Sequence, residues 1–192
     1  MTYFEIIKTL LKEDRSIRRF DTSRPIMPET LESLVELTRY CASGRNLQPL
    51  RYRIVCDPDE RRSLFPLLAW AGYLPDWDGP EESERPAAYL VQCLDTTLAA
   101  NCLCDDGLQL QAITLAARAL GIGSCILKAF DPKKVADALA IDPGYQPRYV
   151  LALGYPVEHV EIEDMKDGDI KYYRTPDAVH HVPKRPLSDL LI

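Results

Sequence analysis

The segment DDGLQLQAITLAARALGIGSC, residues 105–125, decides how this chain folds. Between Leu108 and Leu120 nearly every residue is apolar, and the polar residues Gln111, Thr114 and Arg118 fall at spacings of three and four. A helix that is apolar almost all round is typical of a protein core, so this helix is expected to be the buried hub of the fold. Its alanines allow close approach by a neighbouring helix or by a second copy of itself.

A glycine turn and a strand follow this helix. Gly121 lies where a left-handed residue commonly ends a helix, and the β-prone run Ile122–Leu127 predicts a strand. We expect the helix to begin as early as Leu98, with Asp95 or Thr97 as its N-cap.

Apolar spacing predicts the remaining elements. Helices are expected over residues 3–11, 28–40 and 57–68, and after the Asp131-Pro132 pair, an N-cap followed by proline at the first helical position. Strands are expected over residues 50–56, 87–94 and 149–153. Residues 157–192 are polar and lack a core-forming helix, so they are expected to lie against another part of the protein.

Length and composition suit one globular domain spanning residues 1–192, since 46% of the 192 residues are hydrophobic. No apolar run reaches the roughly 18 to 20 residues of a membrane span, and the N-terminus lacks the basic start of a signal peptide. We therefore expect a cytoplasmic protein with no membrane partner. The net charge of −6 argues against nucleic acid as a partner, because no basic face dominates.

The six cysteines do not indicate a metal site. None forms a Cys-x-x-Cys pair, and the three histidines lie far from them in the sequence. The adjacent His180 and His181 point to opposite faces of an extended chain, which argues against a shared metal ion. We expect all six cysteines to be reduced and structural: Cys41, Cys56, Cys93, Cys102, Cys104 and Cys125.

A basic cluster lies near the N-terminus. Residues 14–20 place four charges around Ser16, outside any clear amphipathic helix. The cluster is either a solvated turn or an anion cradle. In a cradle, Arg15 and Arg18 would supply forked donors and Ser16 a hydroxyl, a combination suited to a phosphate monoester.

A second polar cluster lies in the loop over residues 41–49. It is either an ordinary helix-to-strand loop or a binding loop, since Ser43, Asn46 and Gln48 crowd together in it. Amide side chains offer both donors and acceptors, which a flat heterocycle with alternating carbonyls and ring nitrogens requires.

Four motifs occur in order along the chain: Arg-Ser-Ile-Arg-Arg-Phe at residues 15–20, Ser-x-x-Asn-x-Gln-Pro at 43–49, Gly-Ile-Gly-Ser-Cys at 121–125 and Leu-Gly-Tyr-Pro at 153–156. In this order they resemble the nitroreductase family of FMN-dependent oxidoreductases over nearly the whole chain. The resemblance implies an α+β fold, a three-layer sandwich whose central, mostly antiparallel sheet is flanked by helices. It also implies a homodimer with flavin sites at the interface, and a C-terminal arm, residues 157–192, that reaches the partner subunit.

The resemblance also assigns roles to individual residues. The family's phosphate-binding positions match five residues from the two ends of the chain: Arg15, Ser16, Arg18, Lys184 and Arg185. Its ring-binding positions match three residues of the polar loop, some of them reaching the ring from the other subunit: Ser43, Asn46 and Gln48. The turn whose backbone N–H faces ring nitrogen N5 matches Leu127, Lys128 and Ala129. No catalytic side chain and no metal are implied, because the flavin carries the chemistry.

The chain departs from the family pattern in three places. The polar loop begins Ala42-Ser43-Gly44 instead of Pro-Ser-Ser, and Leu50 replaces the aromatic residue after Gln-Pro. The turn often written Gly-Gly before Phe is Lys128-Ala129, and this lysine would alter the charge over N5.

The implied activity is a ping-pong reaction. NADH or NADPH would reduce the flavin by hydride transfer, and an electron-poor acceptor such as a nitroaromatic or a quinone would reoxidise it. No Gly-x-Gly-x-x-Gly fingerprint follows a strand, so no Rossmann nucleotide site is expected. The segment 69–80, which carries both tryptophans, would help to wall the flavin pocket and select the substrate.

Three alternatives stay open. The same scaffold could carry another redox reaction, such as reductive dehalogenation or an oxidative step on a metabolite. The chain could also be a flavin store or sensor without turnover. A structural domain whose arginine cluster is merely solvated is the third.

Overall fold

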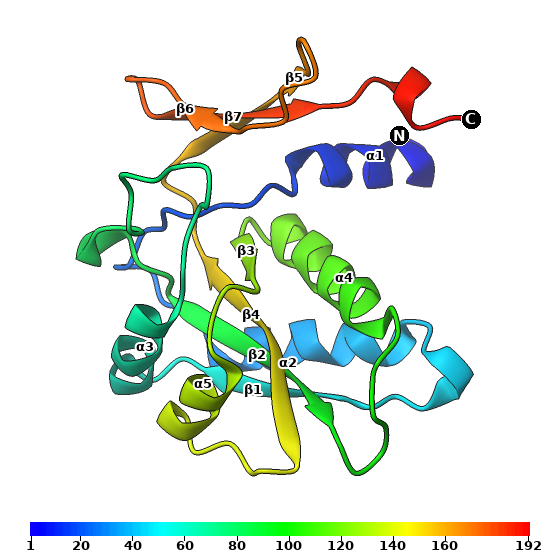
Figure 1. Cartoon of the computed structure of the whole chain (residues 1–192), viewed down its shortest axis with the longest axis vertical. Helices are drawn as coiled ribbons and strands as arrows, with labels where there is room; N and C mark the ends of the chain where they lie inside the picture. Colours follow the sequence, from blue (N-terminus) through cyan, green and yellow to red (C-terminus); the bar gives the residue numbers. More distant parts are fainter.

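A four-stranded antiparallel sheet forms the centre of the computed structural model, which describes all 192 residues (Figure 1). Its strands follow the order β1-β2-β4-β3, with the bounds β1 Leu50–Val55, β2 Ala88–Asp95, β3 Gly123–Leu127 and β4 Tyr145–Gly154. Every residue of β2 is buried, because β1 and β4 flank this strand and helices cover both its faces. The strands expected from the sequence at these places are confirmed.

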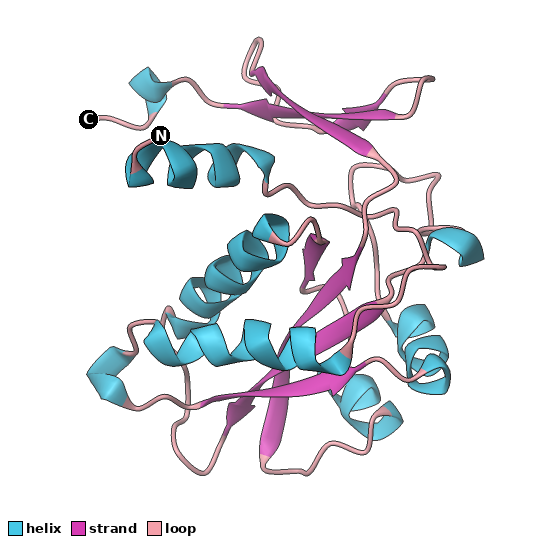
Figure 2. Ribbon diagram, turned by 180° about the vertical axis from the view of Figure 1, so that it is seen from behind, coloured by secondary structure: helices cyan, strands magenta, loops and turns pink.

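Helices cover both faces of this sheet. α2 (Pro28–Glu36) and α4 (Asp105–Ala119) pack on one face, in front of the sheet in Figure 2. α3 (Pro58–Leu64) and α5 (Pro132–Ala138) pack on the other face. Alternate side chains of β2 and β4 supply the two cores, so the fold is the expected α+β sandwich of three layers. No helix is long and apolar enough to cross a bilayer, and all six cysteines are free thiols.

Local signals set where the helices start and stop. The Asp57 and Asp131 side chains each accept two backbone N–H bonds at the start of α3 and α5, and a proline follows each of them. Gly121 adopts a φ angle of +74° after α4, as expected for the residue that ends a helix. Short 3₁₀ turns complete the local structure: Leu37–Tyr40, Gly44–Asn46, Phe65–Leu67, Glu82–Glu84 and Leu187–Asp189.

The start of α4 differs from the expected one. The helix begins at Asp105 rather than near Leu98. Leu103 has a φ angle of +52°, which a right-handed helix does not allow. Asp95 does not cap the helix: its Oδ1 accepts the backbone N–H and the hydroxyl of Thr97 within a turn.

Only one side of α4 is buried, not its whole circumference as expected. Leu110, Ile113 and Ala117 lie in the core against β2 and β4. The opposite side is also apolar but only partly covered, and Leu108 is 45% exposed there. We call this line of side chains the α4 stripe: Leu108, Ala112, Leu115 and Ala119.

Two glycines let the N-terminal segment cross the end of the sheet at close range. Gly123 and Gly154 face each other in the neighbouring strands β3 and β4. A Cβ on Gly123 would lie 2.9 Å from Ile17 Cγ1, and a Cβ on Gly154 would lie 2.8 Å from Phe20 Cβ. Three of the four sequence motifs therefore meet at this point.

The C-terminal residues form a second sheet in the order β5-β7-β6, beside α1 (Tyr3–Glu13) at the top of Figure 1. Its strands are β5 His159–Asp164, β6 Tyr173–Arg174 and β7 Val179–Lys184, and β5 runs parallel to β7. The segment between β4 and β5 contacts residues 18–19 of the same chain, where the Val157 N–H donates to the Arg19 carbonyl at 3.1 Å. An arm that reaches a partner subunit stays a prediction.

The two tryptophans of residues 69–80 pack in or against the core. Trp70 is buried beside Phe65, and Trp77 packs against the same core on the α3–α5 face. Tyr73 is more exposed, at 45%, and its ring centroid lies 4.9 Å from that of Tyr172, next to β6. The large side chains of this segment therefore stabilise the core and the contact with the C-terminal sheet. The expected role of the segment in walling a flavin pocket stays a prediction.

Candidate functional site

The basic cluster of residues 14–20 lies at the edge of the central sheet. Ser16 pairs with Ser124 of β3 as a short parallel bridge, and the Ile17 N–H donates to the Ser124 carbonyl at 2.8 Å. A cavity of about 130 Å³ opens where this segment meets β3 and α4. We call it the cradle, and its lining residues are Asp14, Arg15, Ser16, Gln111, Thr114, Ser124 and Ile126.

Arg15 supplies the cation of the cradle. Its Nη2 donates to the Leu11 carbonyl at 2.7 Å, which holds the side chain against the end of α1. Its Nε is buried and has no acceptor within the chain. Because buried polar groups are nearly always hydrogen bonded, this donor is free to bind an acceptor placed in the cradle. Ser16 is exposed beside it and adds a hydroxyl.

A carboxylate also lies in the cradle, which the motifs did not predict. Asp14 Oδ2 accepts from Gln111 Nε2 at 2.8 Å and from Thr114 Oγ1 at 2.6 Å. The third residue of the same polar line on α4, Arg118, pairs with Glu13 of α1 at 3.0 Å. The three polar residues of the otherwise apolar α4 were therefore the sequence signal for this side of the cradle. Their spacing did not show that Asp14 and Glu13 would be their partners.

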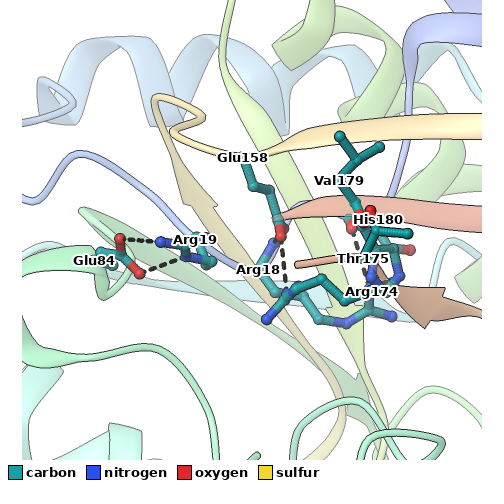
Figure 3. Close-up of polar contacts among 9 residues, drawn as sticks. Arg18, Arg19, Glu84, Glu158, Arg174, Thr175, Val179 and His180 are labelled. Atoms are coloured by element: carbon teal, nitrogen blue, oxygen red, sulfur yellow. Dashed lines mark hydrogen bonds and ion pairs between the residues drawn. The ribbon is translucent and has the colours of Figure 1, made fainter. Parts of the chain in front are cut away.

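The Arg18 side chain lies among residues of the C-terminal sheet, beside Arg174 and His180 (Figure 3). Its Nη1 donates to the Ser16 carbonyl at 3.2 Å and lies 3.3 Å from His180 Nε2. Its guanidinium carbon also lies 5.1 Å from the centroid of the Tyr172 ring. The structure therefore separates Arg18 from Arg15, although the sequence predicted that both would hold one anion.

Two buried side chains, Glu158 and His180, complete the contact between the N-terminal segment and the C-terminal sheet. The Glu158 carboxylate is fully buried and accepts from the Arg18 backbone N–H and from Arg174 Nη2, the latter at 3.0 Å (Figure 3). Burial, and then the charges of Arg18 and Arg174, lower the pKa of His180 to about 4. His180 is therefore neutral near pH 7, and its Nε2 accepts from Arg18.

The two predicted cations of the C-terminus are also separated. Lys184 lies with Arg15 in a groove of about 520 Å³ between α1 and β5. Arg185 instead pairs with Asp189 at 3.7 Å. The structure thus brings Lys184, but not Arg185, to the side of the cradle.

The loop over residues 43–48 lies at the other end of α4, against Asp105. The Asp105 carboxylate accepts from Ser43 Oγ at 2.6 Å and from the Gly44 N–H at 3.0 Å. Asn46 and Gln48 have φ angles of 56° and 49°, and Gln48 Nε2 donates to Asn46 Oδ1 at 3.1 Å. Positive φ at neighbouring non-glycine residues is strained backbone, which clusters at binding and active sites. A cavity of about 340 Å³ adjoins this loop.

A single chain keeps this loop and the cradle apart. Asp105, which holds the loop, and Thr114, which lines the cradle, are nine residues apart on α4. This spacing separates them by about 14 Å along the helix axis and puts them on roughly opposite sides of it. The α4 stripe runs between the two.

The turn after β3 offers two backbone donors. The N–H groups of Lys128 and Ala129 have no acceptor within the chain. The Lys128 side chain folds over β4, where its Nζ donates to the Arg148 carbonyl at 2.9 Å and lies 4.3 Å from the Tyr149 ring centroid. Burial, and then the charge of Arg148, lower the pKa of Lys128. Leu127, the third predicted residue of this turn, packs its side chain in the core.

The sheet order, the flanking helices and the four motifs together define the class of protein. Residues 11–101 and 102–155 match the model of the nitroreductase family, and this chain belongs to that family. The strands of the C-terminal sheet lie beyond the matched residues.

Individual relatives share the length and the fold of the chain. YdgI of Bacillus subtilis, named as an NAD(P)H nitroreductase, is 24% identical over 204 aligned residues, which cover 87% of this chain and 92% of YdgI. A nitroreductase family protein from Streptococcus pneumoniae is 18% identical and has a TM-score of 0.68, over 97% of this chain and 98% of its own. An FMN-dependent nitroreductase from Clostridium difficile is 20% identical and has a TM-score of 0.65, over 83% of this chain and 92% of its own. At these identities, the two solved structures establish a common fold.

Proposed function

We propose that this chain is an FMN-dependent oxidoreductase that takes electrons from NADH or NADPH and passes them to an electron-poor acceptor, such as a nitroaromatic compound or a quinone. The observation that carries the proposal is the cradle, where the unpaired Nε of Arg15 and the hydroxyl of Ser16 lie at the edge of β3. Membership of the nitroreductase family, the name of YdgI and the FMN dependence of the Clostridium difficile protein support it.

The residues of the cradle fit the phosphate of FMN. Arg15 offers an unpaired donor, Ser16 a hydroxyl, and Lys184 lines the groove beside Arg15. Charged hydrogen bonds to phosphate are among the strongest in proteins. Arg18 acts indirectly in this proposal, because its bond to the Ser16 carbonyl orients the backbone of the cradle. Asp14 repels a negatively charged ligand, whereas Arg15 and Lys184 attract it. The affinity for FMN therefore depends on the difference between these two effects.

The part of the proposed site that holds the flavin ring requires a second copy of the chain. The unpaired N–H groups of Lys128 and Ala129 follow the last residue of β3, just beyond the cradle residues Ser124 and Ile126 of the same subunit. The polar loop over residues 43–48 lies on the opposite side of α4, so it reaches the same cofactor only from a partner subunit. Packing of two α4 stripes against each other would bury Leu108 and bring the loop of one chain toward the cradle of the other. The proposed functional unit is therefore a homodimer.

FMN, when bound, supplies the redox chemistry, because it accepts a hydride from the nicotinamide and passes electrons to the second substrate. The residues of this chain bind the cofactor, orient it and set the charge around it. Lys128 adds a cation at the turn with the unpaired amides, and a positive charge there favours the reduced, anionic form of a flavin.

The absorbance spectrum of the purified, untagged protein tests the cofactor directly. We expect a flavin spectrum, and the release of stoichiometric FMN when the protein is denatured. A colourless protein that takes up no added FMN would overturn the assignment of the cradle.

Turnover and the identity of the acceptor need separate measurements. The holoenzyme should consume NADH or NADPH faster than an equal concentration of free FMN, and stopped-flow reoxidation should be fast with nitroaromatics or quinones. Fast reoxidation by a halogenated compound alone would indicate reductive dehalogenation instead. Consumption no faster than that of free FMN would indicate a flavin store or sensor.

A further inference from the structure

A second polar cavity lies on the opposite face of the central sheet from α4. Its volume is about 120 Å³, and α3, the turn Glu82–Glu84 and the start of β2 contribute to its walls. β4 separates β2 from β3, and Tyr89 of β2 faces the α3–α5 core. The cavity is therefore distinct from the proposed FMN site. The lining residues used below are Thr22, Arg61, Arg62, Glu82, Arg85 and Tyr89.

Two of the three arginines in this cavity lack a counter-charge. Arg62 has a carboxylate partner on α3, but neither Arg61 nor Arg85 forms an ion pair. Arg61 forms one hydrogen bond, from Nη1 to the Pro86 carbonyl at 3.1 Å, and the Arg85 guanidinium lies 4.0 Å from the Phe65 ring centroid. The Nε atoms of Arg61 and Arg85 are both buried without an acceptor. Both residues are half-buried, so their guanidinium groups remain able to bind an anion in the cavity, which would supply the missing acceptor to each buried Nε.

Tyr89 presents an unpaired hydroxyl to the same cavity. The residue is 1% exposed, lines the cavity, and its hydroxyl has no hydrogen-bond partner within the chain. Burial raises the pKa of Tyr89, so the hydroxyl stays protonated and remains a donor. The hydroxyl oxygen is not one of the water-shielded atoms without a partner, so it opens into the cavity and is free to donate to a ligand there.

We propose that this cavity is a binding site for a phosphate group, held by Arg61, Arg85 and Tyr89. Guanidinium groups match the oxygens of phosphate two at a time, and the tyrosine hydroxyl supplies a further donor from the strand at the base of the cavity. The phosphate is either the inorganic ion or the terminal group of a phosphomonoester whose remainder lies outside.

Two further side chains shape this site. Thr22 Oγ1 donates to the Arg85 carbonyl at 2.9 Å, which holds the chain segment that carries Arg85. Glu82 is exposed and is the one carboxylate among the lining residues. Its charge opposes an incoming anion, so loss of that charge strengthens phosphate binding.

Thermal unfolding of the FMN-saturated protein tests this site, since a ligand that binds only the folded state raises Tm with its concentration. Inorganic phosphate is titrated against chloride at constant ionic strength, and we expect a saturable rise in Tm. Arg85→Gln should weaken the apparent affinity about tenfold or more, because it removes charged hydrogen bonds. Glu82→Gln should strengthen it. Arg39→Gln, at an exposed arginine of the Leu37–Tyr40 turn, is the matched control and should leave the rise unchanged.

Two more variants separate this proposal from folding defects and from the FMN site. Tyr89→Phe removes one hydroxyl without changing the charge, and it should weaken phosphate binding in isothermal titration. Arg15→Ala removes the cation of the cradle and should leave the phosphate response intact, whether or not the protein binds FMN. A Tm rise that is equal for phosphate and chloride, or that persists unchanged in Arg85→Gln, would overturn the proposal.

Phenyl phosphate distinguishes the two sources of the phosphate group. Binding at least as tight as that of inorganic phosphate would support a phosphomonoester as the ligand. Binding of inorganic phosphate alone would support the free ion. Binding of neither would again overturn the proposal.

Discussion

Asp14 and Arg15 place opposite charges on adjacent residues of the cradle. Asp14 is held by Gln111 and Thr114, whereas Arg15 keeps a buried Nε without an acceptor. An anionic ligand would therefore be attracted by Arg15 and repelled by Asp14. Variants of the two residues should change the affinity for FMN in opposite directions.

Asp14→Asn should raise the affinity for FMN severalfold, because it removes a negative charge and keeps an oxygen that can accept from Thr114. Arg15→Ala should lower the affinity about ten- to hundredfold, because it removes charged hydrogen bonds worth about 1.5–3 kcal/mol. Quenching of flavin fluorescence measures both, with the exposed Arg39→Ala as the control. Equal affinities for all three variants would contradict the assignment of the cradle.

Lys128→Met should lower the reduction potential of bound FMN by tens of millivolts, since about 30 mV corresponds to about 1.4 kcal/mol in a two-electron couple. The physical reason is the loss of a positive charge beside the turn that is proposed to face the ring. The affinity of the flavin for sulfite should fall in parallel. Lys133→Met, at an exposed lysine of α5, is the control. An unchanged potential would mean that Lys128 does not act on the ring.

At the scale of the elements, β3 and β4 need glycine where the N-terminal segment passes them. Gly123→Ala should lower the free energy of unfolding by about 1–3 kcal/mol, because the added Cβ would lie 2.8 Å from Pro156 Cγ and 2.9 Å from Ile17 Cγ1. In Gly107→Ala, the matched control within α4, the added Cβ meets no atom within 4 Å. That change should raise stability by about 0.5–1 kcal/mol. Urea unfolding measures both, and equal effects would argue against the close approach.

α4 carries an apolar line that a lone subunit leaves partly exposed to water. Leu108→Glu should convert the proposed homodimer to a monomer and release FMN, because it places a charge in the α4 stripe. Sedimentation velocity and the flavin absorbance of the same sample measure the two effects together. Met27→Glu, at a residue that is 59% exposed before α2, is the control. A Leu108→Glu protein that remains dimeric and yellow would contradict the proposed interface.

At the scale of the whole molecule, His180 joins the C-terminal sheet to the N-terminal segment. Burial, together with Arg18, Arg174 and His181, lowers its pKa to about 4 in the folded protein. The ordinary pKa of histidine in an unfolded chain is about 6.5. Between these two values the unfolded chain binds more protons than the folded chain, so stability is lost as the pH falls through this window.

His180→Asn should therefore flatten the decline of stability between pH 6.5 and 4, whereas His159→Asn, at an exposed histidine, should not. Urea midpoints measured across this window test the expectation. The same slope for the wild type and His180→Asn would show that the contact between the two ends does not depend on a neutral His180.

Local signals predicted most of the elements. The buried strand β2, the helix starts after Asp57 and Asp131, and the end of α4 at Gly121 depend on neighbouring residues, because backbone sterics and short-range hydrogen bonds decide them. The predicted start of α4 was wrong, since the left-handed Leu103 leaves no mark in the apolar pattern. The role of the tryptophan segment in a pocket wall stays a prediction, since the sequence does not show what packs over a segment.

The sequence by itself determined the family, the α+β sandwich and the residue types able to bind an anion and a flat ring. Only the tertiary structure decided which of these residues act together. It directed Arg18 to His180, added Asp14 to the cradle, and put the loop over residues 43–48 on the other side of α4. The physical reason is that the direction of a long side chain depends on charges and packing from distant parts of the chain. Arg18 and its partner His180 are 162 positions apart in the sequence.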